Sequence, residues 1–227
     1  MLLYDLVNAK GAHFSPNSWR TRLALLHKGL PFEVRDVLFG DIPGLHTGGD
    51  KLTIPTLGHE GQLVTDSWAI AQYLDTTFPD TPRLIAPGAE GHVLKFFQYW
   101  AQTTIHGGIA RLILRDLHDS LDPADQAYFR ASREKMYKTT LEDLQAGREE
   151  RVDAFRKSLQ PLRLALGHGP FISGEQPGYA DYLAFGGFMW ARVSSPFPLL
   201  LADDPVHVWR ERCLDLYAGA ARRERAA

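Results

Sequence analysis

The feature that most constrains the fold of this chain is a change of pattern at residues 78–91, FPDTPRLIAPGAEG. Before this segment, short apolar runs that suit strands alternate with runs at helical spacing, and after it only helical spacing is convincing. The segment itself has no periodicity and holds three prolines and two glycines, which is typical of a link between domains. We therefore expect two domains, at residues 1–80 and 89–227.

The first domain is predicted to open as strand, helix and strand. Residues 2–7 form a short apolar run, residues 18–29 have helical spacing and end at a glycine, and residues 32–39 are β-branched and aromatic. This order favours a parallel pair of strands joined by a right-handed crossover. An irregular segment at 40–53, a hairpin of 54–57 and 62–65, and a helix at 66–78 complete the domain.

The second domain is predicted to be all helical. Helical patterns cover residues 89–118, 123–148, 150–166, 178–194 and 206–217, with proline, glycine and aspartate between them. Gly107 and Gly108 favour a bend in the first of these helices, and Pro161 predicts a kink or a division in the third. The fold class is thus a small α/β domain followed by an all-α domain.

Composition removes several classes of function. The net charge of −2 leaves no broad basic field for nucleic acid or anionic lipid. A single cysteine, Cys213, excludes an internal disulfide framework and a CxxC redox pair. The nine histidines form no metal-binding motif, so we expect no metal. With no secretory leader and no long apolar stretch, we expect a cytoplasmic protein without a membrane partner.

The first candidate site is the segment FSPNSWR at residues 14–20, between the first strand and the first helix. Ser15 and Ser18 both compete for the role of capping the helix, which is the simplest interpretation of either. A helix start also presents free backbone N–H groups and the positive end of a dipole, and a hydroxyl there can donate to an anion. This environment lowers the pKa of a thiol, so a bound thiolate fits it.

Two further segments carry possible binding groups. A proline at the start of a strand is unusual, and Pro55 fits if the Ile54–Pro55 bond is cis, which frees the Ile54 backbone to pair with a ligand. A trans proline on an edge strand is the alternative. Asp66 and Ser67 open a helix and could simply cap it. The same pair could hold an amino acid head group, with carboxylate to ammonium and hydroxyl to carboxylate.

Together these segments resemble the glutathione transferase superfamily, which has a thioredoxin-like N-terminal domain and an all-helical C-terminal domain. The resemblance covers almost the whole chain and favours the serine type. The segments HTGGDK, TDSWAIAQYLDTTFPDTPRL, TLEDLQAGREE and GEQPGYADY are most similar to bacterial lignin β-etherases and to fungal etherase-like glutathione transferases.

The resemblance implies a glutathione site. Ser15 matches the active-site position, Ile54 precedes the cis-proline and would pair with the cysteinyl unit, and Asp66 with Ser67 would grip the γ-glutamyl group. In the family, the residue before the Ile54-Pro55 dipeptide is often Lys, Arg or Gln, but it is Thr53 here. His46 or Lys51 could take its place at the glycine carboxylate. The segment GYAD at 178–181 resembles a buried capping box of the family. Gly178 has no side-chain oxygen, so only Asp181 can act as a cap, and we assign Asp181 to folding.

The resemblance also implies a reaction and a partner. Ser15 would stabilise the glutathione thiolate, which would attack a hydrophobic aromatic electrophile, with β-aryl ether cleavage included. The electrophile is expected between the domains, near Tyr99, Thr103, His106 and Arg111. A zeta-like glutathione-dependent isomerase and a non-catalytic carrier of aromatic ligands are the alternatives. A homodimer is expected, because helices near 67–78 and 89–106 carry apolar groups that need cover.

Overall fold

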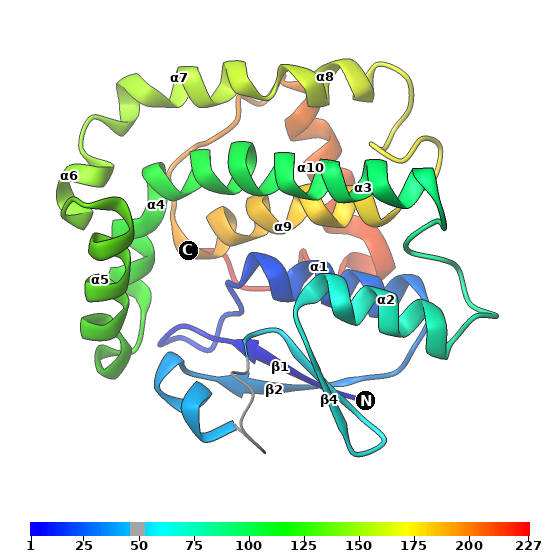
Figure 1. The fold of residues 1–227 in the computed structure, drawn as a ribbon. Coiled ribbons are helices and arrows are strands. Elements are labelled where there is room, and N and C mark those ends of the chain that lie inside the picture. The colour runs from blue at the N-terminus through cyan, green and yellow to red at the C-terminus, as the bar shows by residue number, and fades with distance from the viewer. Residues whose placement is uncertain (46–52) are drawn as a thin grey trace.

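The computed structural model describes residues 1–45 and 53–227, and its N-terminal part is built on a four-stranded sheet (Figure 1). The strands are β1 (Leu2–Leu6), β2 (Glu33–Val37), β3 (Thr56–His59) and β4 (Gln62–Thr65), in the order β2-β1-β3-β4. β1 and β2 are parallel, with Leu2 opposite Glu33, while β3 runs antiparallel to β1 and to β4. The predicted crossover and the predicted hairpin are both present.

Two helices cover one face of this sheet. They are α1 (Pro16–His27) and α2 (Ser67–Thr77), which lie directly above the strands in Figure 1. Leu3 and Leu57 of the sheet are fully buried under Leu23 of α1 and Ile70 of α2. The apolar spacing that predicts each helix thus also supplies the core that holds it on the sheet.

The segment after β2 is more regular than expected. We predicted an irregular stretch at 40–53, whereas a 3₁₀-helix, η1 (Phe39–Leu45), occupies its first part. The carboxylate of Asp125, far along the chain, accepts from the N–H groups of Phe39 (2.7 Å) and Gly40 (2.9 Å). This long-range tie, which local sequence does not reveal, fixes η1 against the helical domain.

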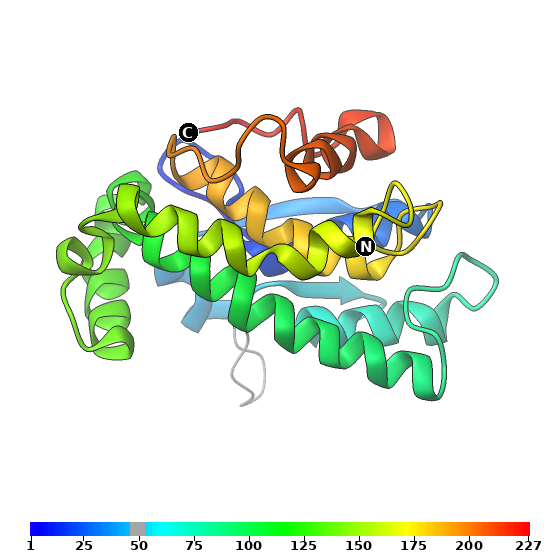
Figure 2. The ribbon, with the colours of Figure 1, turned by 90° about the horizontal axis from the view of Figure 1, so that it is seen from above.

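The second domain is helical, as predicted. Residues 78–88 connect α2 to α3 (Ala89–Trp100), which continues through a π-helix, η2 (Ala101–His106), into α4 (Gly107–Ser120). The remaining helices are α5 (Pro123–Tyr137), α6 (Leu141–Gln145), α7 (Arg148–Ser158), α8 (Gln160–Leu166), α9 (Tyr179–Ser194) and α10 (Pro205–Gly219). Seen from above, α9 runs through the middle of the molecule, with α3 and α4 on one side and α10 on the other (Figure 2).

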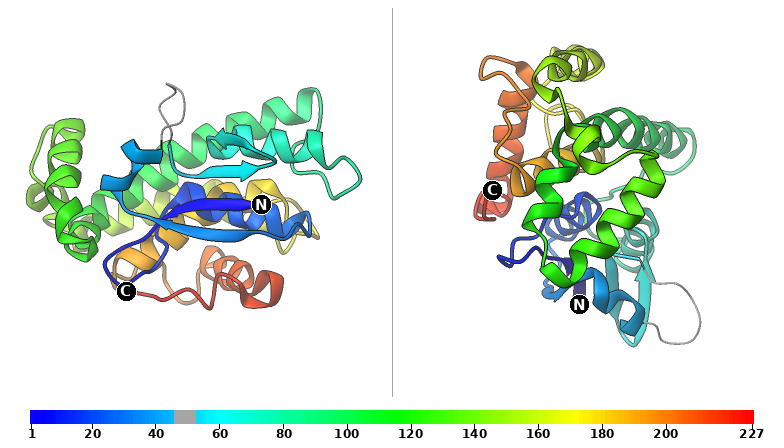
Figure 3. Two further views of the ribbon diagram at one scale, coloured as in Figure 1. Left: turned by 90° about the horizontal axis from the view of Figure 1, so that it is seen from below. Right: turned by 90° about the vertical axis from the view of Figure 1, so that its left-hand side faces the viewer.

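Two predicted helices are divided in the structure. The helix expected over 123–148 ends at Tyr137, and the next residue, Lys138, takes a left-handed conformation (φ 55°). Thr140 then caps α6 by accepting from the Asp143 N–H at 3.1 Å. The division near Pro161 was expected, and it separates α7 from α8 at Leu159. As Figure 3 shows, α5 consequently turns down beside η1 and closes one end of the molecule.

The two domains meet where α1 packs against α9. A Cβ at Gly186 would lie 2.3 Å from the carbonyl oxygen of Pro16, so only glycine allows this approach. The carboxylate of Asp181, at the start of α9, is fully buried and accepts from the N–H groups of Ile172 (2.8 Å) and Gly178 (3.0 Å) and from the indole of Trp209 (2.8 Å). These contacts fit the structural role expected of Asp181.

No helix in the described part of the chain is both long and apolar enough to cross a membrane.

Candidate functional site

The main cavity lies between the two domains and has a volume of about 590 Å³. The start of α1, the segment before β3 and η1 line one side, and η2, α4, α5 and α9 line the other. The sheet domain contributes Leu6, Phe14, Ser15, Pro16, Asn17, Phe39, Ile42, Thr53 and Ile54. The helical domain contributes Gln102, His106, Gly107, Ala110, Leu114, Leu117, Tyr128, Phe129, Arg133, Met136, Tyr137 and Trp190.

Ser15 is the N-cap residue of helix α1 and lines this cleft. Its extended backbone (φ −63°, ψ 120°) ends the preceding loop, and its hydroxyl oxygen accepts from the Ser18 N–H at 3.2 Å. Pro16 follows as the first helical residue, where a missing N–H costs nothing. Because the Ser15 oxygen accepts from the backbone, its own proton remains available for a ligand in the cleft.

Ser18 occupies a different position. It is fully buried and does not line the cleft, and its hydroxyl lies near the carboxylate of Asp5 in β1 but has no hydrogen-bond partner among the described residues. Of the two serines that compete in the sequence, the structure therefore brings only Ser15 to the cleft. Asn17, between them, also lines it.

The segment carrying Ile54 is tied to the segment carrying Asp66. The Ile54–Pro55 peptide bond is cis, and Ile54 lines the cleft. The preceding residue, Thr53, donates its N–H to the hydroxyl of Thr65 at 3.0 Å, and the two threonine hydroxyls are 2.8 Å apart. Thr65 directly precedes Asp66, so this pairing places the helix start of α2 beside Ile54.

Asp66 caps α2 with one carboxylate oxygen. Oδ1 accepts from the N–H groups of Trp68 (2.9 Å) and Ala69 (3.0 Å), and within the described residues Oδ2 has no protein partner. Asp66 is exposed, whereas Ser67 is buried and its carbonyl accepts from the Tyr179 hydroxyl at 2.9 Å. Neither residue lines the main cleft. Both lie next to it, because the preceding Thr65 is hydrogen-bonded to Thr53, which lines the cleft.

Two cations lie near this helix start. Arg20 of α1 is buried, and no carboxylate in the described parts of the chain forms an ion pair with it. Lys95 of α3 lies 4.2 Å from the centre of the Trp68 ring. Burial lowers the pKa of both groups, and the nearby Asp66 carboxylate partly offsets this. A ligand carboxylate bound here would therefore meet a positive field.

His106 lines the cleft as a neutral base. Burial, together with the guanidinium of Arg20, lowers its pKa to about 3. Its Nε2 accepts from Arg20 at 3.5 Å, and a Cβ at Gly187 would lie 2.7 Å from the ring, so α9 packs directly on it. His106 therefore adds polarity to the cleft but no charge at neutral pH.

The other residues expected to contact the electrophile lie elsewhere. Tyr99 is exposed on α3, and the hydroxyl of the exposed Thr103 donates back to the Tyr99 carbonyl at 2.9 Å. Arg111 is exposed on α4, with its guanidinium carbon 5.9 Å from the centre of the Tyr137 ring. These three side chains do not line the cleft because they occupy the outward faces of their helices. His46 and Lys51 fall outside the described residues.

Several lining residues were missed by the sequence analysis. Gln102 is exposed on η2, one turn before His106, and Trp190 comes from α9. Tyr128, Arg133 and Tyr137 come from α5, where residues 128, 129, 133, 136 and 137 share one helical face. This spacing is visible in the sequence, but only the tertiary contact shows what the face lines.

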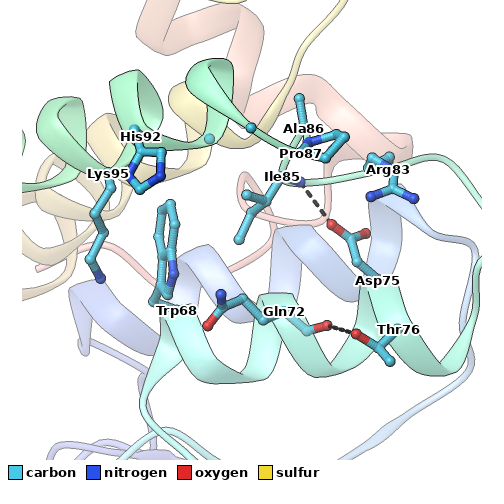
Figure 4. A pocket seen from close by; sticks show the side chains of 12 residues that line it. Trp68, Gln72, Asp75, Thr76, Arg83, Ile85, Ala86, Pro87, His92 and Lys95 are labelled. Atoms are coloured by element: carbon cyan, nitrogen blue, oxygen red, sulfur yellow. Dashed lines mark hydrogen bonds between the residues drawn. The ribbon is translucent and has the colours of Figure 1, made fainter.

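A second hollow of about 390 Å³ lies between α2 and α3 (Figure 4). Trp68 and Lys95 lie side by side at one end of it, and Asp75 at the other end accepts from the Ile85 N–H at 2.8 Å. It contains neither Ser15 nor Ile54. Nowhere in residues 1–45 or 53–227 do three or more histidine, cysteine, aspartate or glutamate side chains gather as metal ligands.

Comparisons with protein families match both domains. Residues 14–77 match the family described as glutathione S-transferase, N-terminal domain. Residues 93–197 match glutathione S-transferase, C-terminal domain. The two matches together span most of the chain and confirm the predicted fold class, a thioredoxin-like domain followed by a helical domain.

Individual relatives agree with these matches. The chain is similar to the solved glutathione transferase GSTFuA2 of Phanerochaete chrysosporium, with 28% identity, a TM-score of 0.76, and coverage of 100% of this chain and 98% of that one. A glutathione S-transferase of Ceriporiopsis subvermispora, solved in complex with glutathione, gives 25% identity, a TM-score of 0.74, and coverage of 97% and 93%. The glutathione S-transferase-like protein ustS of Aspergillus flavus is 26% identical over 216 residues, 83% of this chain and 78% of its own.

Proposed function

Because the chain belongs to the glutathione S-transferase superfamily, we propose that it binds glutathione, stabilises its thiolate with Ser15 and directs it at an aromatic electrophile. The observation that carries this proposal is the position of Ser15. Its hydroxyl lies at the start of α1, inside a cleft whose other walls are largely aromatic and aliphatic. A hydrogen-bond donor at a helix start suits an anion, and the walls suit an aromatic partner.

Glutathione would lie along the line from Ser15 to Asp66. The Ile54 backbone would pair with the cysteinyl unit, beside Ser15. Oδ2 of Asp66, which has no partner among the described residues, would accept from the γ-glutamyl ammonium. Ser67 and the positive field of Arg20 and Lys95 would receive the carboxylate. The complex of the Ceriporiopsis relative with glutathione supports this choice of ligand.

The chemical task of Ser15 is modest in energy. A cysteine-like thiol has a pKa near 8.5, so only about 3 % is thiolate at pH 7. Lowering that pKa by about 2 units makes most of it thiolate and requires roughly 2.7 kcal/mol of differential binding. The Ser15 proton, the Asn17 N–H and the dipole of α1 together are of the right size. Ser15 is thus a donor, and the glutathione sulfur is the nucleophile.

The reaction would be a displacement at carbon. The thiolate forms a carbon–sulfur bond while the leaving group departs with the bonding electron pair. A β-aryl ether belongs to the proposed class, because an aryloxide is then the leaving group. Phe14, Phe39 and Tyr128 would contact the aromatic ring, and the neutral His106 would contribute a polar wall to the same cleft.

One experiment separates the proposed functions. The protein is incubated with glutathione and either 1-chloro-2,4-dinitrobenzene or a β-aryl ether, and both thiol loss and products are measured. A transferase consumes one glutathione per product, an isomerase regenerates it, and a carrier binds aromatics without turnover. Absence of conjugation with both compounds, together with an unshifted pKa of bound glutathione, would contradict the proposal.

We also propose that the chain forms a homodimer through α3. Val93, Phe96 and Tyr99 are all more than half exposed on this helix, next to the hollow between α2 and α3. Such a contiguous apolar face favours a second copy as its cover. Light scattering should give about twice the mass of the 25.5 kDa chain, and Phe96→Glu should halve it. A mass of one chain in the parent protein at micromolar concentrations would refute the dimer.

A further inference from the structure

The cleft contains one charged side chain that the proposed reaction does not use. Arg133 of α5 lines it, and among the described lining residues there is no aspartate or glutamate. His106, the only other titratable base in the lining, is neutral because burial and Arg20 lower its pKa to about 3. Among the described lining residues, Arg133 therefore carries the single positive charge in a largely aromatic and aliphatic cavity.

No described carboxylate neutralises this charge. The acidic groups of the same region have other partners: Glu134 accepts from Arg130 at 2.8 Å, and Glu142 accepts from Arg130 at 2.9 Å. Asp125 is occupied by the N–H groups of Phe39 and Gly40. Within residues 1–45 and 53–227, the one hydrogen bond that Arg133 donates to protein runs from Nη1 to the Ser132 hydroxyl at 2.9 Å.

The guanidinium is nevertheless held in place. Its central carbon lies 4.8 Å from the centre of the Phe129 ring, which itself lines the cleft. Stacking on a ring leaves the edge of the guanidinium, with most of its N–H donors, free for a planar acceptor. The partial burial that lowers the pKa of Arg133 also weakens competition from water. The arrangement suits a carboxylate, which accepts two parallel N–H bonds.

We propose that the second substrate is an aromatic electrophile bearing a carboxylate, and that Arg133 binds this carboxylate and so determines specificity. The inference rests on the proposed function of the cleft, because it assigns the partner of the glutathione thiolate. The aromatic part would pack against Phe39 and Tyr128. Arg133 would not touch the reacting carbon, so its effect appears in the choice of substrate.

The test compares two electrophiles with the same ring and leaving group, the anionic 4-chloro-3-nitrobenzoate and its neutral methyl ester, whose different intrinsic reactivity is corrected for. In both, the thiolate adds at the carbon bearing chlorine, and chloride leaves with the electron pair. Each kcat/KM is divided by the uncatalysed rate constant, and the carboxylate-to-ester ratio is the readout. We expect Arg133→Met to lower this ratio at least about tenfold, because a charge-assisted pair is lost. Arg133→Lys should restore part of it.

Arg130→Met is the matched control, since Arg130 lies on the same helix with its ion pairs outside the cleft. The ratio in this variant should equal that of the parent. An equal loss of both rates in Arg133→Met would mean that the residue acts by packing, and would overturn the proposal. A parent ratio that already favours the ester would do the same.

Binding without turnover separates this inference from the proposed function. Calorimetry with 2-naphthoate and with 2-naphthamide, in the absence of glutathione, measures the preference for a carboxylate directly. We expect the parent to prefer 2-naphthoate about tenfold and Arg133→Met to show no preference. If conjugation is absent but this preference is present, the proposed function fails and the site stands. If neither ligand is preferred, the assignment of Arg133 fails regardless of any activity.

Discussion

The two sides of the cleft are built in different ways. On the sheet side, the candidate groups are backbone N–H groups and caps at helix starts: Ser15 on α1, Ile54 before β3, and Asp66 on α2. On the helical side, they are side chains such as His106 and Arg133, which project from long helices. The sheet side is therefore suited to one fixed ligand, and the helical side to a variable one.

This difference has an energetic counterpart. The groups on the sheet side lie within a few residues of a strand or a helix cap, so local geometry fixes them. The groups on the helical side depend on contacts between distant residues, such as Asp125 with η1 and Gly186 with Pro16. We expect substitutions on the sheet side to affect ligand binding and substitutions on the helical side to affect stability and specificity.

The largest effect is expected at Asp181, which supports the helical side. Asp181→Ala leaves the N–H groups of Ile172 and Gly178 and the indole of Trp209 without their buried acceptor. The free energy of unfolding should fall by at least about 3 kcal/mol, as measured by urea denaturation. Asp203→Ala, at an exposed aspartate, is the control and should change it little. Equal stability of the two variants would refute the role of Asp181.

The second effect concerns the sheet side at Asp66. Asp66→Asn keeps an acceptor for the N–H groups of Trp68 and Ala69 but removes the charge. Glutathione affinity should weaken by about 1.5–3 kcal/mol in calorimetry, with the free energy of unfolding nearly unchanged. Asp66→Ala should lose affinity and, because the cap is lost, also stability. Unchanged affinity in Asp66→Asn would remove the head-group assignment.

How much of the molecule the sequence predicts follows the same division. Pro16 and the glycine after α1 are local signals, and the structure has the Ser15 cap and the end of the helix there. The proline-rich segment at 78–91 is also a local signal, and it contains the connection between α2 and α3. The parallel pairing of β1 and β2 also follows from the order of elements. Each of these features depends on neighbours along the chain.

The features that the sequence did not predict depend on distant contacts. The left-handed turn at Lys138 divides a stretch whose pattern predicts one helix. The separate helix α5 then packs against η1, where Asp125 accepts from the Phe39 N–H. The π-helix η2 brings Gln102 into the cleft and leaves Thr103 outside it, which a regular helical pattern does not anticipate. The spacing of Arg133 from Phe129 and Tyr137 is visible in the sequence, but only the tertiary contact shows that this face of α5 lines the cleft, whereas Arg130 forms surface ion pairs.

The third effect is a pH dependence that arises on the helical side. The pKa of His106 is about 3 in the folded state, below its ordinary value of 6.5. Between these two pH values the unfolded chain is protonated at His106 and the folded chain is not. Stability from this group is therefore complete above pH 6.5 and falls as the pH drops towards 3. Between pH 7.5 and 5, the parent should lose on the order of 1–2 kcal/mol more than His106→Gln. Parallel curves in urea denaturation would contradict this.

The smallest effect is expected at Ser15, where one neutral donor acts. Ser15→Ala removes the proposed hydrogen bond to the thiolate and should raise the activation barrier by about 1 kcal/mol at pH 7. It also removes the acceptor for the Ser18 N–H, so helix α1 should lose some stability. Turnover must therefore be measured well below the melting temperature, with stability recorded for each variant.

The pH dependence of Ser15→Ala distinguishes thiol activation from capping. If Ser15 stabilises the thiolate, the pKa of bound glutathione rises in the variant, and activity recovers as the pH is raised. Loss of the cap alone leaves that pKa unchanged. Ser18→Ala is the matched control, because Ser18 is buried against Asp5 and does not line the cleft. An identical thiolate absorbance titration in Ser15→Ala and the parent would assign the role to backbone N–H groups or the Asn17 side chain, and the sheet side would then act without the Ser15 hydroxyl.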